Sequence, residues 1–209
     1  MPQFVLNWFA APVMVNPNAT GQRAVYRQKS VGGSFISTGF TPANDLSIVA
    51  QTTTSPNLSA NKIWEFKIQA LCTSGGPTDN NNGIIEALKF ACLTPTLSST
   101  TSTATIQLNV ASLDITKAVF SLHLVSDNTV VYGPVTATPS GTVIQTQATG
   151  IDDDTDYYWT YTLKSTVNGV EISSTDSTQL NQECQSVQFS TPPDVCLPVT
   201  ATTAVAAEF

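Results

Sequence analysis

The fold is decided by one stretch in the second half of the chain, Ile151-Asp152-Asp153-Asp154-Thr155-Asp156-Tyr157-Tyr158-Trp159-Thr160-Tyr161-Thr162-Leu163. From Tyr157 onward, every second residue is large and apolar: Tyr157, Trp159, Tyr161 and Leu163. A period of two is typical of a β-strand with one face toward a core, because successive side chains point to opposite sides. The stretch therefore predicts a strand whose core face carries these four side chains.

The same arrangement occurs in the first half. Ile151 precedes Tyr157 by six residues, and Leu58 likewise precedes Trp64 by six. The alternation then continues through Phe66, Ile68 and Ala70. The two aromatic positions lie 93 residues apart, which is the usual size of one domain.

Further short segments with the same period occur in the same order in both halves. They are residues 5–9, 23–27, 46–49 and 87–90 in the first half, and 105–110, 117–124, 142–144 and 186–189 in the second. No stretch has a helical period. Short strands separated by turn residues indicate an all-β sandwich in each half. We expect domains at residues 1–95 and 96–196, a linker near 93–102, and a C-terminal tail at 197–209.

The corner of the repeated stretch resembles fibronectin type III domains. In that family an aliphatic residue and a short polar stretch, often ending in threonine, precede an aromatic residue that starts a strand. Residues 151–157 match this order, so Tyr157 would be the tyrosine-corner residue, with its hydroxyl bonded to the backbone upstream. The stretch from Leu58 to Trp64 matches less well, because tryptophan has no hydroxyl. The resemblance implies two tandem Ig-like β-sandwiches and no particular activity.

The composition argues against nucleic acids and membranes as partners. Only 11% of the 209 residues are charged, the net charge is −7, and the eight Lys and Arg residues do not cluster. A phosphate-binding face is therefore not expected. The richest apolar stretch, residues 8–15, contains Pro12 and is far shorter than the roughly 20 residues of a membrane-spanning helix.

The first residues are apolar but do not match a secretion signal. No Lys or Arg precedes them, and Asn7 interrupts them. We expect a first strand here, and we expect the protein to be made in a cytoplasm and to reach its destination by assembly.

The four cysteines do not predict a metal site, because none forms a CxxC pair. Cys72 and Cys92 continue apolar rows and are expected to face one core. A hairpin between their strands would place Cys72 nearer Glu86 than Cys92. Cys72 and Cys92 would then be offset by ~20 Å along the strands, too far for a bridge. We therefore expect these two to be buried free thiols. The pattern does not place Cys184 relative to Cys196.

The strongest candidate for a ligand site is an acidic run, Asp152, Asp153, Asp154 and Asp156. Its spacing matches the first half of an EF-hand loop. Position six is then Tyr157 where glycine is required, and position twelve is Leu163 where a glutamate belongs. A solvated turn is the preferred interpretation, and a weak cation site is the alternative.

Other candidate sites are weaker. His123 alternates with apolar neighbours and is expected to face outward, without the paired nucleophile that acid–base chemistry requires. Gly32-Gly33 and Gly75-Gly76 lack the lysine and helix of a phosphate loop and are read as turns. Tyr158 and Tyr132 are the aromatics that remain available for a carbohydrate platform. We predict no catalytic, cofactor-binding or metal-binding residue, and no cofactor.

These expectations favour a structural, non-enzymatic protein. We expect a virion protein of a tailed bacteriophage, such as a capsid decoration, neck or tail component, that contacts other virion proteins in a multi-copy assembly. Residues 22–27 are similar to a strand of sandwich domains in such proteins. The alternative is a secreted or cell-surface adhesion or carbohydrate-binding module of a bacterium. In the virion assembly the tail, with Val199, Val205 and Phe209, is expected to dock on a neighbour.

Overall fold

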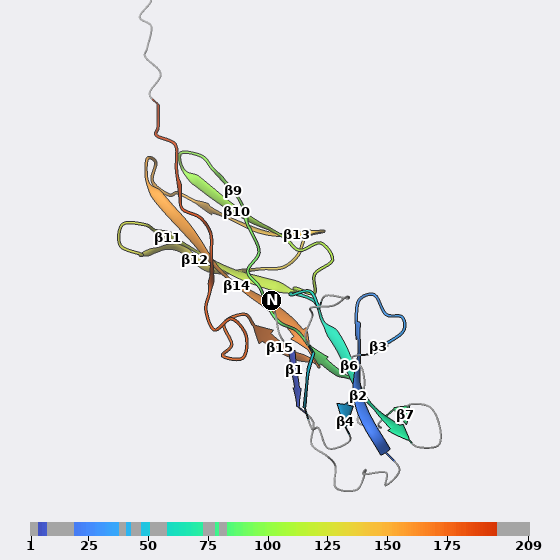
Figure 1. The fold of residues 1–209 in the computed structure, drawn as a ribbon. Helices are drawn as coiled ribbons and strands as arrows, with labels where there is room; N and C mark the ends of the chain where they lie inside the picture. Colours follow the sequence, from blue (N-terminus) through green and yellow to red (C-terminus); the bar gives the residue numbers. More distant parts are fainter. Residues whose placement is uncertain are drawn as a thin grey trace, which may run out of the picture.

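The chain folds as an all-β protein in the computed structural model, which describes residues 4–7, 19–37, 41–42, 47–50, 58–72, 78–79 and 83–195. Figure 1 shows two groups of strands that follow one another along the molecule. The first group is β1 (Phe4–Asn7), β2 (Ala19–Gln28), β3 (Ile36–Ser37), β4 (Thr41–Pro42), β5 (Ser47–Ala50), β6 (Trp64–Cys72), β7 (Thr78–Asp79) and β8 (Ile85–Ala87). The second is β9 (Thr96–Ser99), β10 (Thr103–Asn109), β11 (Lys117–Leu124), β12 (Val130–Ala137), β13 (Val143–Thr149), β14 (Asp156–Val167), β15 (Val170–Ser173), β16 (Cys184–Gln185) and β17 (Phe189–Ser190).

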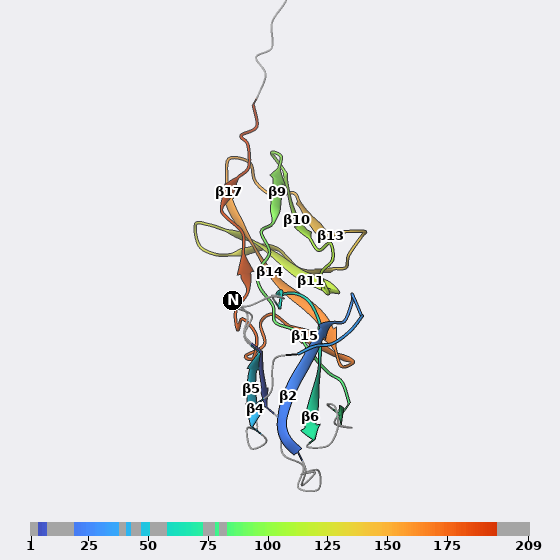
Figure 2. The same ribbon diagram turned by 45° about the vertical axis from the view of Figure 1, so that its right-hand side comes forward.

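The second group forms a sandwich of two antiparallel sheets. One sheet has the order β13-β10-β9, and the other has the order β12-β11-β14-β15, with β16 and β17 also paired to β14. Figure 2 shows β9, β10 and β13 lying across the β11 and β14 layer. The central pair aligns Leu122 with Trp159 and Phe120 with Tyr161.

The first group repeats this pairing plan. β1 pairs with β5 as β10 pairs with β13, and β2 pairs with β6 as β11 pairs with β14. The corner residue pairs with the last residue of the partner strand in both halves: Trp64 with Gln28 of β2, and Tyr157 with Leu124 of β11. The pairing confirms the predicted all-β fold and the predicted repeat of one plan.

The core of the second sandwich uses the alternation seen in the sequence. Tyr157, Trp159, Tyr161 and Leu163 are at most 1% exposed, as predicted. They pack with alternate residues of the other strands, including Ile106, Leu108, Phe120, Leu122 and Ile144. In the first sandwich, the described core is a smaller cluster of Tyr26, Leu58, Trp64 and Phe66.

The predicted linker is partly wrong. Residues 96–99, assigned to it from their Ser/Thr content, form β9 and pair with β10. Their β-branched and small polar side chains suit an edge strand, whose outer side faces water. The predicted strands 87–90 and 186–189 are also shorter than expected, because residues 88–90 and 186–188 bond irregularly to neighbouring segments.

Several expectations lie outside the described residues. These are the tail at 197–209, Cys196 and the turn at Gly75-Gly76. Among the residues that are described, no helix is long and apolar enough to cross a membrane.

Candidate functional site at the junction of the two sandwiches

The chain leaves the first sandwich through residues 88–93, which we call the connector. Leu88 and Phe90 are 3% and 4% exposed, and with Ile63 they belong to the core cluster of the second sandwich. Burying a side chain of this size contributes about 1.5–3 kcal/mol relative to leaving it in water. The two sandwiches therefore share part of one hydrophobic core.

Asn61 ties the connector to the first sandwich. Its side-chain Nδ2 donates to the Ala91 carbonyl at 2.9 Å, and its Oδ1 accepts from the Ala91 amide at 3.0 Å. The Asn61 amide also donates to the Lys89 carbonyl. Asn61 has a φ of 60°, a left-handed conformation that asparagine tolerates better than most residues. It is 3% exposed, so these bonds are shielded from water.

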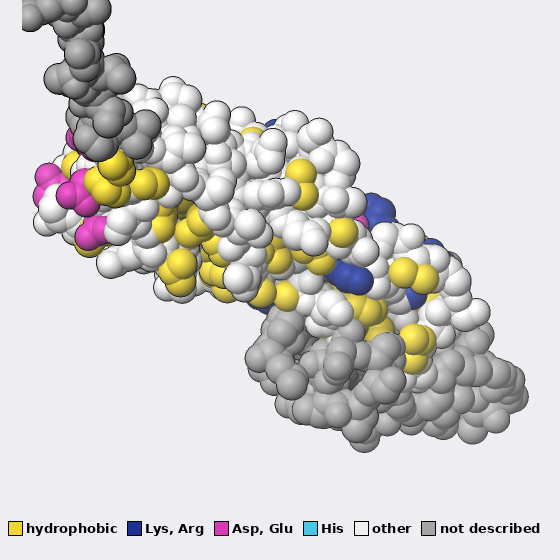
Figure 3. All heavy atoms as spheres, turned by 90° about the horizontal axis from the view of Figure 1, so that it is seen from above, with side chains coloured by type: hydrophobic (Ala, Val, Ile, Leu, Met, Phe, Trp, Pro, Cys, Tyr) yellow, Lys and Arg dark blue, Asp and Glu magenta, His cyan; other side chains and the backbone are white. Residues whose placement is uncertain are grey.

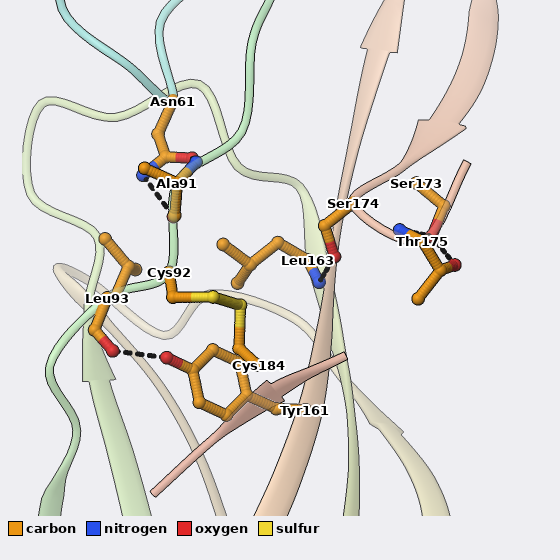
Figure 4. Close-up of a disulfide and its surroundings, with 10 residues drawn as sticks. All are labelled: Asn61, Ala91, Cys92, Leu93, Tyr161, Leu163, Ser173, Ser174, Thr175 and Cys184. Atoms are coloured by element: carbon orange, nitrogen blue, oxygen red, sulfur yellow. Dashed lines mark hydrogen bonds between the residues drawn. A yellow bond between two sulfur atoms is a disulfide. The ribbon is translucent and has the colours of Figure 1, made fainter. Parts of the chain in front are cut away.

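A disulfide ties the next connector residue to the second sandwich. Cys92 is bonded to Cys184 of β16, with their Cα atoms 5.5 Å apart (Figure 4). The prediction that Cys92 is a buried free thiol is therefore wrong, because Cys92 is exposed and is bonded to a cysteine 92 residues later in the chain. The assumed hairpin register was also wrong, because Glu86 pairs with Glu65 and not near Cys72. The side chain of Cys72 lies outside the described part of the structure.

Tyr161 anchors Leu93, the connector residue that follows Cys92. Its hydroxyl donates to the Leu93 carbonyl, and β14 places it directly opposite Cys184. Burial raises the pKa of Tyr161 to about 12, so the hydroxyl stays protonated and remains a donor at neutral pH. Figure 4 shows Asn61, the disulfide and Tyr161 arranged along the connector. Ala91, Cys92 and Leu93 are thus each anchored by a different group.

Loops of the second sandwich complete the junction. The Gln179 side chain accepts from the Phe90 amide at 3.2 Å and donates to the Leu88 carbonyl at 3.2 Å. Asp114 accepts from the Ile63 amide at 2.6 Å, and its own amide donates to the Asn61 carbonyl at 2.8 Å. These contacts pair backbone groups that would otherwise be left unsatisfied at a partly buried interface.

An exposed contact closes the junction on another side. Asn168, at the tip of the β14–β15 hairpin, donates through its amide to Glu86 Oε2 at 3.0 Å and through Nδ2 to the Glu86 carbonyl at 3.1 Å. Lys29 lies 2.5 Å from the other oxygen of Glu86. The hydrogen bond from Lys29, followed by the bond from Asn168, lowers the pKa of Glu86.

The predicted tyrosine corner is confirmed. The Tyr157 hydroxyl accepts from the Asp152 amide at 3.0 Å and donates to the Asp152 carbonyl at 3.4 Å. The first sandwich has an equivalent that the sequence analysis missed. Trp64 Nε1 donates to the Ser59 carbonyl at 3.2 Å, across the same separation of five residues. An indole N–H can therefore replace the hydroxyl as donor at this corner.

The acidic run forms an exposed turn. Asp153 Oδ2 accepts from the Asp194 amide at 2.8 Å, and Asp156 accepts from the Ser190 hydroxyl. The side chains are thus used to fasten the last described segment of the chain. No group of three or more His, Cys, Asp or Glu residues in the described part of the structure could hold a metal ion.

His123 and Tyr158 lie on the outer face of the β11–β14 sheet. Their rings stack with centroids 4.9 Å apart, and His123 Nε2 lies 3.1 Å from the Thr160 hydroxyl. His123 faces away from the core as predicted, but only part of it is exposed. The prediction that Tyr158 is available as an exposed aromatic is wrong: it is 8% exposed, and its hydroxyl donates to Asn128 Oδ1. Tyr132 is partly buried and bonded to Thr146.

The sequence pattern does not reveal the junction. Cys92 and Cys184 are 92 residues apart and follow different repeated stretches, whereas pairing was considered only between cysteines of the same half, so this pair was missed. Asn61 and Gln179 carry no signal either, because their partners are backbone groups.

No protein-family model matches the sequence, and a search of curated proteins gives no match. Solved structures give matches at low identity. A two-domain fibronectin type III segment of chicken tenascin is 13% identical, covers 90% of this chain and 92% of its own, and has a TM-score of 0.45. The interferon gamma receptor alpha chain of chicken is 11% identical, with coverages of 91% and 92% and a TM-score of 0.38. The FN1-FN3 domains of chicken CNTN1 are 10% identical, with coverages of 91% and 60% and a TM-score of 0.33. None of these similarities bears on what the chain does.

Proposed function

We propose that this chain is a structural, non-enzymatic virion protein of a tailed bacteriophage, which acts through contacts with other virion proteins. The observation that carries the proposal is the junction. We expect two sandwiches that share core residues and a disulfide-anchored connector to act as a spacer of fixed geometry, which suits a component that positions its neighbours. A capsid auxiliary, neck or tail position would each use this property.

The low content of charged residues supports the same role. Permanent protein interfaces avoid unpaired charge and rely on close packing, and only 11% of this chain is charged. The disulfide is compatible with a virion, because disulfides persist on virion and cell surfaces once a protein has left the reducing cytoplasm.

The same disulfide favours a second candidate, an adhesion or carbohydrate-binding module that is secreted or displayed by a bacterium. Such proteins reside in oxidising surroundings. The burial of Tyr158 counts against a carbohydrate platform on the outer face of β14, since sugar stacking requires an exposed ring.

The test is to fractionate a culture of the source into purified phage particles, cell envelopes and medium, and to measure this chain in each by quantitative mass spectrometry. A fixed copy number per particle is the expected result. Recovery of the chain only with envelopes or medium would contradict the virion proposal and support the second candidate.

A second test concerns assembly. A chain ending at Pro198 should fold as the full chain does, because both described cores lie before this position, but it should not join the particle. Incorporation at the full-length level would show that residues 199–209 have no role in assembly.

A further inference from the structure

The two sulfur atoms of the junction disulfide belong to residues in different surroundings. Cys92 is exposed, whereas Cys184 is 1% exposed and packs in the core of the second sandwich. Cys184 lies opposite Tyr161, whose ring is also 1% exposed. An external reagent can therefore approach the bridge from the Cys92 side, while the core covers the Cys184 side.

We propose that Cys92 is a site of modification by small thiols, and that this modification unlocks the junction between the two sandwiches. The proposal depends on the disulfide and its surroundings, and it applies whether the protein works in a virion or on a cell surface.

The chemistry is thiol–disulfide exchange. A thiolate attacks Cys92 Sγ, forms a new S–S bond to it and breaks the Cys92–Cys184 bond, and Cys184 leaves as a thiolate that takes up a proton. The product is a mixed disulfide on Cys92 and a buried thiol at Cys184. A second thiol can attack the mixed disulfide, releasing reduced Cys92 and a small disulfide. Two electrons then pass from two small thiols to the protein bridge.

Opening the bridge should affect the connector first. Ala91 remains held by Asn61, which belongs to the first sandwich, so this contact does not join the two halves. The connector keeps non-covalent ties to the second sandwich: hydrogen bonds with Tyr161 and Gln179, the bond from Lys89 Nζ to the Thr178 carbonyl, and the burial of Leu88 and Phe90. These non-covalent contacts can break locally while the strand ladders of the second sandwich persist.

The direction of attack is tested on the native, oxidised protein with 2-mercaptoethanol, a small neutral thiol. Samples quenched with acid at early times are digested and mapped by mass spectrometry. We expect the adduct on Cys92 at least about tenfold more often than on Cys184. Equal labelling, or an excess on Cys184, would overturn the proposal.

The unlocking is tested with trypsin, because Lys89 lies within the connector and Lys117 lies within β11. The double variant Cys92→Ala/Cys184→Ala is compared with the oxidised wild type, without added thiol. We expect cleavage after Lys89 to rise at least about tenfold more than cleavage after Lys117. Equal changes at both lysines, or no change at Lys89, would show that the bridge does not lock the connector; the adduct map stands even if this variant folds poorly.

Discussion

The hydroxyl of Tyr157 makes two hydrogen bonds to the same residue, and this closes the turn before β14. The ring is 1% exposed, while Asp152, which supplies both backbone partners, lies at the surface. Water can thus reach the Asp152 backbone if the hydroxyl is removed. The ring and the hydroxyl contribute separately to this corner.

Tyr157→Phe removes the hydroxyl and keeps the ring. We expect the free energy of unfolding of the second sandwich to fall by about 0.5–1.5 kcal/mol, since a hydrogen bond is lost but its partners can be rehydrated. Urea denaturation of the full chain measures this. Tyr158→Phe is the matched control, because its hydroxyl bonds only to the exposed Asn128 side chain, and it should cost less. A larger loss at Tyr158 would contradict this account of the corner.

Single residues could be predicted where the order or the spacing of residue types is typical of one position in the fold. The order aliphatic, polar, aromatic located Tyr157, and the alternation located the core face of β14. Trp64 was placed in the first corner, but its indole donor was overlooked because only a hydroxyl was considered. Tyr158 was misjudged because alternation predicts the face of a strand and cannot predict that His123 and Asn128 cover that face.

At the scale of elements, the connector belongs to no strand, and Asn61 pairs part of its backbone. This residue satisfies both backbone groups of Ala91 from a buried position. A side chain that lacks either the donor or the acceptor would leave one of these groups unpaired.

Asn61→Ala should lower the free energy of unfolding by about 2–5 kcal/mol, because two shielded backbone groups lose their partners and alanine is strained at positive φ. Asn181→Ala is the control for strain alone, since Asn181 is exposed and has a φ of 56°. Denaturant unfolding of both variants gives the comparison. Similar losses in the two variants would mean that the Ala91 contacts contribute little.

The edge strand β15 pairs with β14 and also carries an exposed pair of ionic contacts at Glu171. Glu171 receives a hydrogen bond from Lys117 of β11 and another from Lys164 of β14, at 2.7 Å and 2.9 Å. The bond from Lys117, followed by the bond from Lys164, lowers the pKa of the Glu171 carboxyl below its ordinary 4.5. Because the folded pKa is below the unfolded one, the contribution of this group to stability is present above pH 4.5 and is lost as the pH falls through the folded pKa.

A carboxyl-detected NMR titration of the full chain should therefore show Glu171 titrating below 4.5. Lys117→Gln should move its pKa upward, and Lys164→Gln should do so by a smaller amount, because the Lys117 contact is the larger cause. An unchanged Glu171 titration in Lys117→Gln would contradict the assignment.

The strands and their core faces could be predicted from the period of two, whereas their pairing and the ends of elements could not. Residues 96–99 look like a linker because Ser and Thr serve equally in loops and at edge strands. Residues 88–90 look like a strand because they alternate, yet their apolar side chains are used to join two cores. The junction could not be predicted, because side chains that bond to backbone groups leave no pattern in the sequence.

On the scale of the whole molecule, charge is divided unevenly. Residues 1–95 contain six Lys or Arg and four Asp or Glu, a net charge of +2, while residues 96–195 contain two Lys and ten Asp or Glu, a net charge of −8. Figure 3 shows acidic side chains gathered at the end of the second sandwich that lies away from the first. The acidic turn lies at this end of the sandwich. β14 starts beside the turn at Asp156 and ends next to Asn168, which contacts Glu86 at the junction.

Self-repulsion should therefore make the second sandwich more sensitive to salt. Raising NaCl from roughly 10 mM to roughly 150 mM shortens the Debye length from about 30 Å to about 8 Å. We expect the protection of amides in β10, β11 and β14 to increase more than that of amides in β2 and β6, as followed by hydrogen exchange and mass spectrometry. Equal increases in both sandwiches would contradict the role of net charge.

The disulfide has a mechanical consequence, because it closes a loop that contains β9 to β15. Tension applied to the two ends of the chain passes from Cys92 to Cys184 through the sulfur atoms, so residues 93–183 carry none of it. In a single-molecule pulling experiment, the oxidised chain should show no extension from residues 93–183, and only β16 and β17 at the end of this sandwich can be pulled away. The reduced chain should release about 300 Å more, at roughly 3.3–3.6 Å per residue. Equal contour lengths in the two states would contradict this path of force. With the bridge closed, a load on this protein can extend only its first sandwich and its ends.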